Sequence, residues 1–269
     1  MKRVLAIDGG GIRGIIPASF LERLEYHSGK RVHELFDLIA GTSTGGILAL
    51  GYVTPPYGKT AGELLDLYRM NGHVIFGSKK WWGPLFRPKY DVGPLERLMD
   101  KYFGETLLSK AIVPTLVTSY DIHLRRNQVF KSWETGRDMR KDYKMKDVAR
   151  ATSAAPTYFE PAVLGEGVFV DGGLMANNPA GVAYAEAKRL ASPEAKERAE
   201  QLTTKAKRLA SAAEERAEQL TAEAERLASE AEERPEQYTP GYAVWQRLHA
   251  KELIAKNVAE VCPSGLPRV

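Results

Sequence analysis

The chain has 269 residues, of which 43% are hydrophobic and 27% are charged, and its formal net charge is +4. These values are ordinary for a globular protein, and the length allows a core that needs no disulfide or metal for stability. The single cysteine, Cys262, excludes an intramolecular disulfide and a multi-cysteine zinc site, and the mild charge argues against a dedicated nucleic-acid binder.

Strands and helices are predicted to alternate along residues 1–185. Short apolar runs predict strands over residues 3–8, 36–40, 112–120, 127–133 and 168–170. Apolar residues at helical spacing predict helices over residues 15–26, 45–53, 61–70 and 94–102. This alternation is typical of an α/β protein in which helices cover a largely parallel sheet.

The N-terminal apolar run, Val4 to Ile7, is shorter than the roughly 7–15 apolar residues of a signal-peptide core. No stretch reaches the ~18 apolar residues of a transmembrane helix. We therefore expect a soluble, cytoplasmic protein.

The composition changes between Glu186 and Glu236. This segment contains no glycine and no aromatic residue, and thirteen glutamates against ten lysines or arginines give a net charge of −3. The rest of the chain therefore carries +7. Three similar blocks start at Lys188, Lys207 and Glu225, and the spacing between the last two starts equals about five turns of an α-helix. The repeat predicts a helical segment, and we divide the chain into domains at 1–185, 186–236 and 237–269, the last a C-terminal helix and tail.

This repetitive segment is predicted to be a solvated helical arm that packs one apolar stripe against the body or a partner. Ser192 and Pro193 are typical of the N-cap and first residue of a helix. A membrane-surface helix is the alternative, but the stripe is mostly alanine and the segment is slightly acidic. The near-perfect repeat and the narrow choice of residues lead to the hypothesis that the segment was engineered.

A G-x-S-x-G motif, Gly41-Thr42-Ser43-Thr44-Gly45, follows a predicted strand and precedes a predicted helix. In that context Gly41 and Gly45 permit a sharp reversal of the chain, and the hydroxyl of Ser43 projects beside a helix N-terminus. The helix dipole there favours developing negative charge. We interpret Ser43 as a candidate nucleophile, with an ordinary strand-to-helix turn capped by Ser43 as the alternative.

A glycine run, Asp8-Gly9-Gly10-Gly11-Ile12-Arg13-Gly14, also lies between a predicted strand and a predicted helix. Successive glycines expose backbone N–H groups that can hold a phosphate or the oxyanion of a tetrahedral intermediate, and Arg13 adds a positive charge. The spacing also matches a dinucleotide-binding fingerprint. That function is disfavoured because Glu34 precedes the second strand instead of ending it.

The third motif, Asp171-Gly172-Gly173, follows the strand predicted at 168–170. A carboxylate on such an open turn can act as the base of a serine nucleophile when the two lie within hydrogen-bond distance. A simple Asp-Gly turn is the alternative.

In this order and spacing, the three motifs resemble those of patatin-like phospholipases. The resemblance covers residues 1–185 and includes the sequence from Asp171 to Pro179 and the segment Ala151-Thr152-Ser153-Ala154-Ala155-Pro156. It implies a three-layer α/β/α sandwich with a mostly parallel central sheet. It also implies a serine lipid acyl hydrolase that cleaves fatty-acyl esters through a Ser–Asp dyad and an acyl-enzyme.

The resemblance implies a role for each motif. The dyad consists of a nucleophile and a base, Ser43 and Asp171. The oxyanion hole consists of the N–H groups of two glycines, supported by a third glycine and an arginine: Gly10, Gly11, Gly9 and Arg13. The remaining glycines flank the nucleophile or follow the base: Gly41, Gly45, Gly172 and Gly173. Neither a metal nor an organic cofactor is expected.

Two alternatives remain open. Ser43, Asp171 and His249 occur in the chain order of an α/β-hydrolase triad, although His249 lies in a predicted helix beyond the arm. The other is a patatin scaffold rebuilt as a non-catalytic binding or structural protein. It is suggested because patatin-like sheets usually continue with a further strand, and no such strand is visible between Tyr184 and Tyr238.

A cluster of aromatic and basic residues indicates which binding partners to expect. Trp81 and Trp82 lie among Lys79, Lys80 and Arg87. Tryptophan beside basic residues suits the headgroup region of an anionic membrane, whereas the alternative is a loop that buries its aromatic side chains on the core. We expect a lipid or small ester substrate, peripheral contact with an anionic membrane surface, and no nucleic acid.

Overall fold

A computed structural model describes residues 3–77, 88–134 and 142–233. Contacts within the chain divide it into two units, Met1–Ala191 and Ser192–Val269. Trp81, Trp82, His249 and the helix predicted within residues 237–269 lie outside the described residues.

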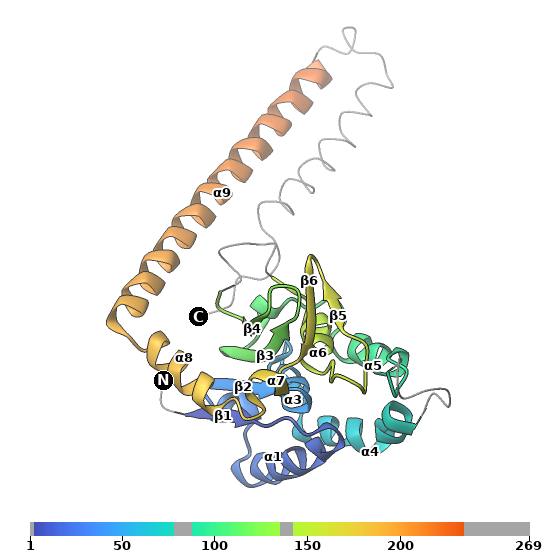
Figure 1. Cartoon of the computed structure of the whole chain (residues 1–269). Coiled ribbons are helices and arrows are strands. Elements are labelled where there is room, and N and C mark those ends of the chain that lie inside the picture. Colours follow the sequence, from blue (N-terminus) through green and yellow to red (C-terminus); the bar gives the residue numbers. More distant parts are fainter. Residues whose placement is uncertain (1–2, 78–87, 135–141, 234–269) are drawn as a thin grey trace. The chain divides into compact units, whose positions relative to one another are not determined.

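The first unit contains a central sheet with six strands in its described part (Figure 1). In chain order the strands are β1 (Val4–Ile7), β2 (Leu38–Thr42), β3 (Thr115–Asp121), β4 (Arg126–Lys131), β5 (Ala162–Leu164) and β6 (Gly167–Asp171). β1, β2 and β3 pair in parallel, β4 and β6 both pair antiparallel with β3, and β5 pairs antiparallel with β6. Four of these six strands, β1, β2, β3 and β5, therefore run in one direction, which confirms the predicted mostly parallel sheet.

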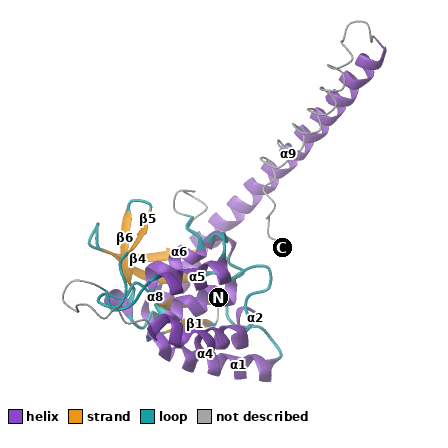
Figure 2. Ribbon diagram, turned by 90° about the vertical axis from the view of Figure 1, so that its right-hand side faces the viewer, coloured by secondary structure: helices purple, strands orange, loops and turns teal. Residues whose placement is uncertain are grey.

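Helices cover both faces of this sheet. They are α1 (Ile15–Ser28), α2 (Val32–Leu35), α3 (Thr44–Val53), α4 (Ala61–Gly77), α5 (Gly93–Phe103), α6 (Met145–Thr152), α7 (Gly173–Ala176) and α8 (Ala180–Leu190). Ile39 and Val117 point into the larger core, which they share with side chains of α1 to α6. Their neighbours Leu38 and Leu116 point the other way and pack with Ala183 of α8. Because alternate strand residues serve opposite cores, the predicted three-layer sandwich is confirmed. α1 and α4 lie side by side in both views (Figures 1 and 2).

Two strands meet end to end on one edge of β3. Along that edge Thr118 pairs with Thr42, the last residue of β2, and Ser119 pairs with Asp171, the last residue of β6. β4 occupies the opposite edge along the same stretch of β3. Since β2 runs parallel to β3 and β6 runs antiparallel to it, the carboxyl ends of β2 and β6 point at each other. The topology thus brings Ser43, the residue after β2, to the end of β6.

Every strand and helix predicted within residues 1–185 has a counterpart, and the structure adds α2, α6, α7, β5 and the first residues of α8. α2 and β5 have four and three residues, and α6 has eight, which is too short for periodicity to separate a helix from a loop. α4 extends to Gly77, beyond the predicted end at residue 70. The last four residues of the predicted glycine turn form a 3-10 helix, Gly11–Gly14.

The second unit is described as one helix, α9 (Pro193–Glu233). It begins at Pro193, directly after Ser192, which confirms the predicted helix start. The compositional change at Glu186 falls inside α8. There Glu186 forms an ion pair with Lys131 of β4 at 2.9 Å, and Leu190 packs on the sheet. The domain limits and the engineered origin of the repeat remain predictions.

Candidate active site

Ser43 lies at the sharp turn between β2 and α3. Its φ of 55° and ψ of −122° lie outside the regions that non-glycine residues favour. A side chain at Gly41 would collide with the backbone of Gly45, and a side chain at Gly45 would collide with the carbonyl group of Ile7. The two glycines of the G-x-S-x-G motif therefore let the strand and helix cross closely enough to hold Ser43 in this conformation.

The hydroxyl of Ser43 donates a hydrogen bond to Oδ2 of Asp171 at 2.6 Å. The other carboxyl oxygen, Oδ1, accepts a hydrogen bond from the backbone N–H of Gly173 at 2.7 Å. Ser43 and Asp171 are 9% and 7% exposed. Burial raises the pKa of the Asp171 carboxyl above its ordinary value, and the hydrogen bonds from Ser43 and Gly173 oppose part of that rise. The pair is therefore a serine in contact with a carboxylate of increased basicity.

The glycine run lies beside this pair. Within the described part of the chain, the backbone N–H groups of Gly10 and Gly11 donate to no protein acceptor. The N–H of Gly9 is different, because it donates to the carbonyl oxygen of Asn177 at 2.9 Å. A Cβ at Gly9 would collide with the Asn177 side chain and lie 3.2 Å from Cβ of Ser43. Gly9 thus brings the run close to Ser43, while Gly10 and Gly11 keep their donors free.

Ser43, Asp171, Gly10, Gly11 and Arg13 all border one cavity of about 550 Å³. Its other walls are largely apolar and come from α3, α4, α5, α7, the segment before α5 and the segment after α6: Ile47, Leu67, Tyr68, Ile75, Tyr90, Leu95, Met99, Tyr158, Phe159 and Leu174. None of the described residues that line it is a histidine. A second serine, Ser153, also borders the cavity, but its hydroxyl donates to the carbonyl oxygen of Ala149 at 2.6 Å and has no carboxylate partner among its described contacts.

Two further polar residues contact the turn and were not predicted from the sequence. The hydroxyl of Thr152, at the end of α6, accepts a hydrogen bond from the backbone N–H of Ser43 at 2.8 Å. The hydroxyl of Tyr68 accepts a hydrogen bond from Oγ1 of Thr44 at 2.5 Å, and burial raises the pKa of Tyr68 above its ordinary value. The only signal for Thr152 was its place in the segment Ala151 to Pro156. The sequence carries no signal for Tyr68, because it occupies one of the core-facing positions of a predicted helix.

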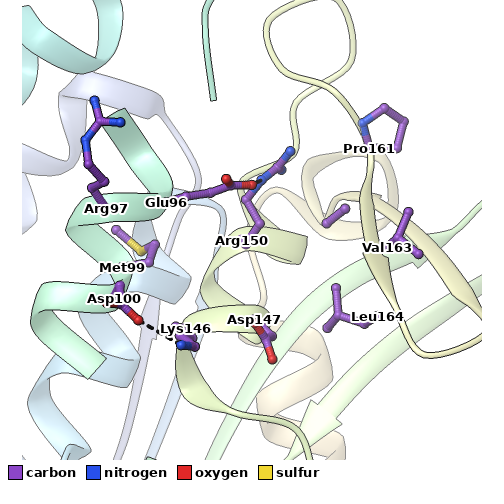
Figure 3. A pocket seen from close by; sticks show the side chains of 11 residues that line it. Glu96, Arg97, Met99, Asp100, Lys146, Asp147, Arg150, Pro161, Val163 and Leu164 are labelled. Carbon is purple, nitrogen blue, oxygen red and sulfur yellow. Dashed lines mark hydrogen bonds and ion pairs between the residues drawn. The ribbon is translucent and has the colours of Figure 1, made fainter. Parts of the chain in front are cut away.

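A second cleft of about 500 Å³ is lined by α5, α6 and residues 161–164 (Figure 3). Lys146 contacts Asp100 there at 2.7 Å, and Arg150 contacts Glu96 at 3.2 Å. Met99 borders both this cleft and the cavity that holds Ser43. Met99 of α5 therefore lies between a charged hollow and a largely apolar one.

Within the described ranges, no helix combines the length and the hydropathy that crossing a bilayer requires. Within the same ranges, no three His, Cys, Asp or Glu side chains gather as metal ligands.

Comparison with known proteins identifies the family of this chain. The sequence profile of the patatin-like phospholipase family matches residues 5–184. Patatin-1-Kuras 2 from Solanum tuberosum is 38% identical over 173 residues, which make up 60% of this chain and 45% of that protein. Patatin-17 from Solanum cardiophyllum is also 38% identical, over 60% of this chain and 44% of its own length. The chain thus spans less than half the length of these relatives.

One solved structure, VipD from Legionella pneumophila, is similar with a TM-score of 0.35 and 15% identity, over 64% of this chain and 46% of that one. The family match covers all three motifs and ends before the repetitive segment. The chain belongs to the patatin-like phospholipase family.

Proposed function

We propose that the protein is a serine lipid acyl hydrolase that cleaves fatty-acyl esters through Ser43 and Asp171. The observation that carries this proposal is the 2.6 Å hydrogen bond from the Ser43 hydroxyl to the buried Asp171 carboxylate, at the wall of a largely apolar cavity. The polar pair supplies the chemistry and the apolar walls suit an acyl chain. Membership of the patatin-like phospholipase family supports the same activity.

In the first half-reaction, Oγ of Ser43 attacks the carbonyl carbon of the ester while its proton moves to Oδ2 of Asp171. The oxyanion that forms accepts hydrogen bonds from the free N–H groups of Gly10 and Gly11. When the tetrahedral intermediate collapses, the bond between the carbonyl carbon and the alcohol oxygen breaks. The alcohol then leaves with the proton from Asp171, and the acyl group remains on Ser43.

In the second half-reaction, water attacks the acyl carbonyl carbon and gives a proton to Asp171. The bond from Oγ of Ser43 to the acyl carbon breaks, and the fatty acid leaves. The proton on Asp171 returns to Ser43, so atoms and charges balance over one cycle.

A carboxylate acts here without a histidine because its surroundings increase its basicity. Burial raises the pKa of Asp171, which brings it closer to that of the proton donor it must serve. The N-terminus of α3 and the positive charge of Arg13 favour the negative charge that develops during attack.

We further propose that the protein contacts an anionic lipid surface through one face of α1 and the turn before it. Ile12, Ile16 and Phe20 are spaced by four residues and are 45%, 65% and 68% exposed. Such a row lies on one side of a helix, and neighbouring exposed apolar side chains can form an interaction surface. Ile12 also lines the cavity that holds Ser43, so a lipid on this face would be next to the dyad.

Co-sedimentation with phosphatidylcholine vesicles, with and without phosphatidylglycerol, tests the membrane contact. Replacing Ile16 and Phe20 by serine is expected to lower binding to both, and the anionic lipid is expected to strengthen binding of the unaltered protein. Tyr184→Ser, an exposed aromatic residue on the opposite layer, serves as the control. Equal binding of all three proteins would remove this surface from the proposal. A Trp81/Trp82 double alanine variant tests the aromatic cluster in the same way.

Hydrolysis of a p-nitrophenyl fatty-acyl ester tests the activity. Ser43→Ala is expected to abolish the turnover of the unaltered protein, whereas Ser153→Ala, in the same cavity, retains most of it. Equal rates for Ser43→Ala and the unaltered protein would favour the non-catalytic scaffold. His249→Ala separates the two catalytic alternatives, because a dyad keeps its activity and an α/β-hydrolase triad loses it.

A further inference from the structure

Thr152 lies at the last position of α6, and its side chain is buried. Its hydroxyl accepts a hydrogen bond from the backbone N–H of Ser43 at 2.8 Å and donates one to the carbonyl oxygen of Thr118 at 2.7 Å. Thr118 is the residue of β3 at which β2 ends. One hydroxyl therefore joins α6, the central strand and the turn that carries Ser43.

The same segment also contacts the other end of the dyad. The carbonyl oxygen of Thr152 accepts a hydrogen bond from the N–H of Gly172 at 3.3 Å, and the carbonyl oxygen of Ala154 accepts one from the N–H of Asp171 at 3.0 Å. Ser43 and Asp171 are 128 residues apart in sequence, so the packing of the fold sets their separation. Thr152 contacts the backbone beside both of them.

We propose that Thr152 is a positioning residue that holds the backbone of Ser43 so that its hydroxyl faces Asp171. The turn needs such support, because a non-glycine residue with a φ of 55° and a ψ of −122° is strained and keeps that conformation only when its surroundings hold it. The bond from the Ser43 N–H to Thr152 connects that strained residue directly to a buried side chain.

A hydroxyl suits this place because it accepts one hydrogen bond and donates another through the same atom. The methyl group of Thr152 fills space beside α3, since a Cβ at Gly46 would lie 2.8 Å from it. Valine would keep this shape and lose both hydrogen bonds, whereas serine would keep the hydroxyl and lose the methyl group. The two variants therefore separate hydrogen bonding from packing.

α6 is itself anchored on its far side. Arg150, only 8% exposed, contacts Glu96 of α5, and its Nη2 donates to the carbonyl oxygen of Glu160 at 2.6 Å (Figure 3). Lys146, one turn earlier, contacts Asp100. The Arg150 contacts anchor the last turn of α6, on which Thr152 lies, and the Lys146 contact anchors its first turn.

The test compares Thr152→Val and Thr152→Ser with Thr115→Val, a matched control. Thr115 is also buried, and its hydroxyl donates to the carbonyl oxygen of Val113 at 2.8 Å, at the far end of β3 from the dyad. With a p-nitrophenyl ester as substrate, Thr152→Val is expected to lower kcat by about 10-fold to 100-fold with little change in KM, because small misplacements of reacting groups cost that much. Thr152→Ser is expected to recover most of the loss, and Thr115→Val to keep the rate.

The pH profile gives a readout that a merely structural role would not move. The hydrogen bond from Ser43 lowers the pKa of Asp171, so weakening it in Thr152→Val is expected to shift the acidic limb of kcat/KM to higher pH. The other titratable groups that line the cavity are unchanged in all variants: Arg13, Tyr68, Tyr90 and Tyr158. A shift therefore reports on Asp171.

This inference rests on the proposed function, and hydrogen exchange of the Ser43 amide distinguishes the two. That amide is expected to exchange faster in Thr152→Val than in Thr115→Val, whether or not the protein turns over the ester. Positioning by Thr152 is overturned if Ser43 exchange is unchanged, if serine fails to recover kcat, or if Thr115→Val loses as much activity. The proposed function alone fails if exchange responds as expected while the unaltered protein hydrolyses ester no faster than Ser43→Ala.

Discussion

Two hollows of similar volume, about 550 and 500 Å³, share Met99 of α5 in their walls but differ in the polar groups that line them. In the first, one serine and one carboxylate are buried among apolar side chains, and burial raises the pKa of the carboxyl. In the second, acidic and basic groups pair at the surface. Lys146 of this hollow also pairs with Glu105 outside it, and hydrogen bonds from Lys144 and Lys146 lower the pKa of Glu105 to about 2. The hollow with more charged groups is therefore not the one proposed as the active site, which instead holds a few buried polar groups directed at one another.

The largest effect is expected from the buried pair itself. Ser43→Ala removes the nucleophile and Asp171→Asn removes the base, so each is expected to lower kcat for ester hydrolysis by at least ~10³-fold, and the double variant to be no worse than either. Asp147→Asn, a carboxylate of the charged cleft, is the matched control and is expected to keep its rate. Additive losses in the double variant would show that the two residues do not act as one unit.

A second large effect, on stability and kcat, is expected at Gly45, where α3 crosses closely over β1 beside Ser43. Gly45→Ala introduces a Cβ that collides with the carbonyl group of Ile7, and is expected to destabilise the fold by roughly 1–3 kcal/mol and to lower kcat. Gly181→Ala in α8 meets nothing within 4 Å and is expected to be neutral or stabilising. Thermal unfolding of the two variants measures the difference, and equal unfolding midpoints would contradict the close crossing of β1 and α3.

Within the charged cleft, the buried Arg150 is expected to contribute more to the free energy of unfolding than the more exposed Lys146. Arg150→Met leaves the carbonyl oxygen of Glu160 without its donor and is expected to lower the free energy of unfolding by roughly 1–3 kcal/mol. Lys146→Met removes ion pairs to exposed carboxylates and is expected to leave the unfolding midpoint unchanged. Denaturant unfolding of both variants measures the two changes, and a larger loss of unfolding free energy for Lys146→Met than for Arg150→Met would contradict the prediction.

The smallest effect concerns the cost of keeping Asp171 ionised. Its pKa is raised in the folded state, so the folded protein binds this proton more tightly than the unfolded chain does. The associated stability is present below the unfolded pKa and is lost as pH rises through the folded pKa. Asp171→Asn is therefore expected to raise the unfolding midpoint at neutral pH, and the gain is expected to vanish below about pH 4, where both forms are neutral.

Ester hydrolysis is expected to follow the same titration, because Asp171 must be ionised to accept the proton of Ser43. Activity should fall as pH drops through the raised pKa of Asp171, above the ordinary value of 3.8. For the stability prediction, the contradicting result is an Asp171→Asn variant that is less stable than the unaltered protein at neutral pH, because burying an ionised Asp171 would then carry no cost.

Much of the site follows from sequence, because its chemistry is encoded in short motifs. Ser43 between two glycines, and Asp171 before two glycines, are visible from local spacing and from the predicted strands that precede them. Thr152 is different, since its importance depends on strands from three parts of the chain meeting at Thr118. The occupied N–H of Gly9 is also invisible in sequence, because its acceptor, Asn177, lies beyond β6, at the other end of the matched family region. Local geometry was predictable, whereas contacts that depend on the end-to-end meeting of β2 and β6 required the structure.

Covalent labelling by a fluorophosphonate, which reacts with activated serines, tests whether Asp171 activates Ser43. We expect one adduct per chain, located by peptide mass spectrometry at Ser43, retained in Ser153→Ala and lost in Ser43→Ala and Asp171→Asn. Labelling at Ser153 instead, or labelling of Ser43 that survives Asp171→Asn unchanged, would contradict activation of Ser43 by Asp171.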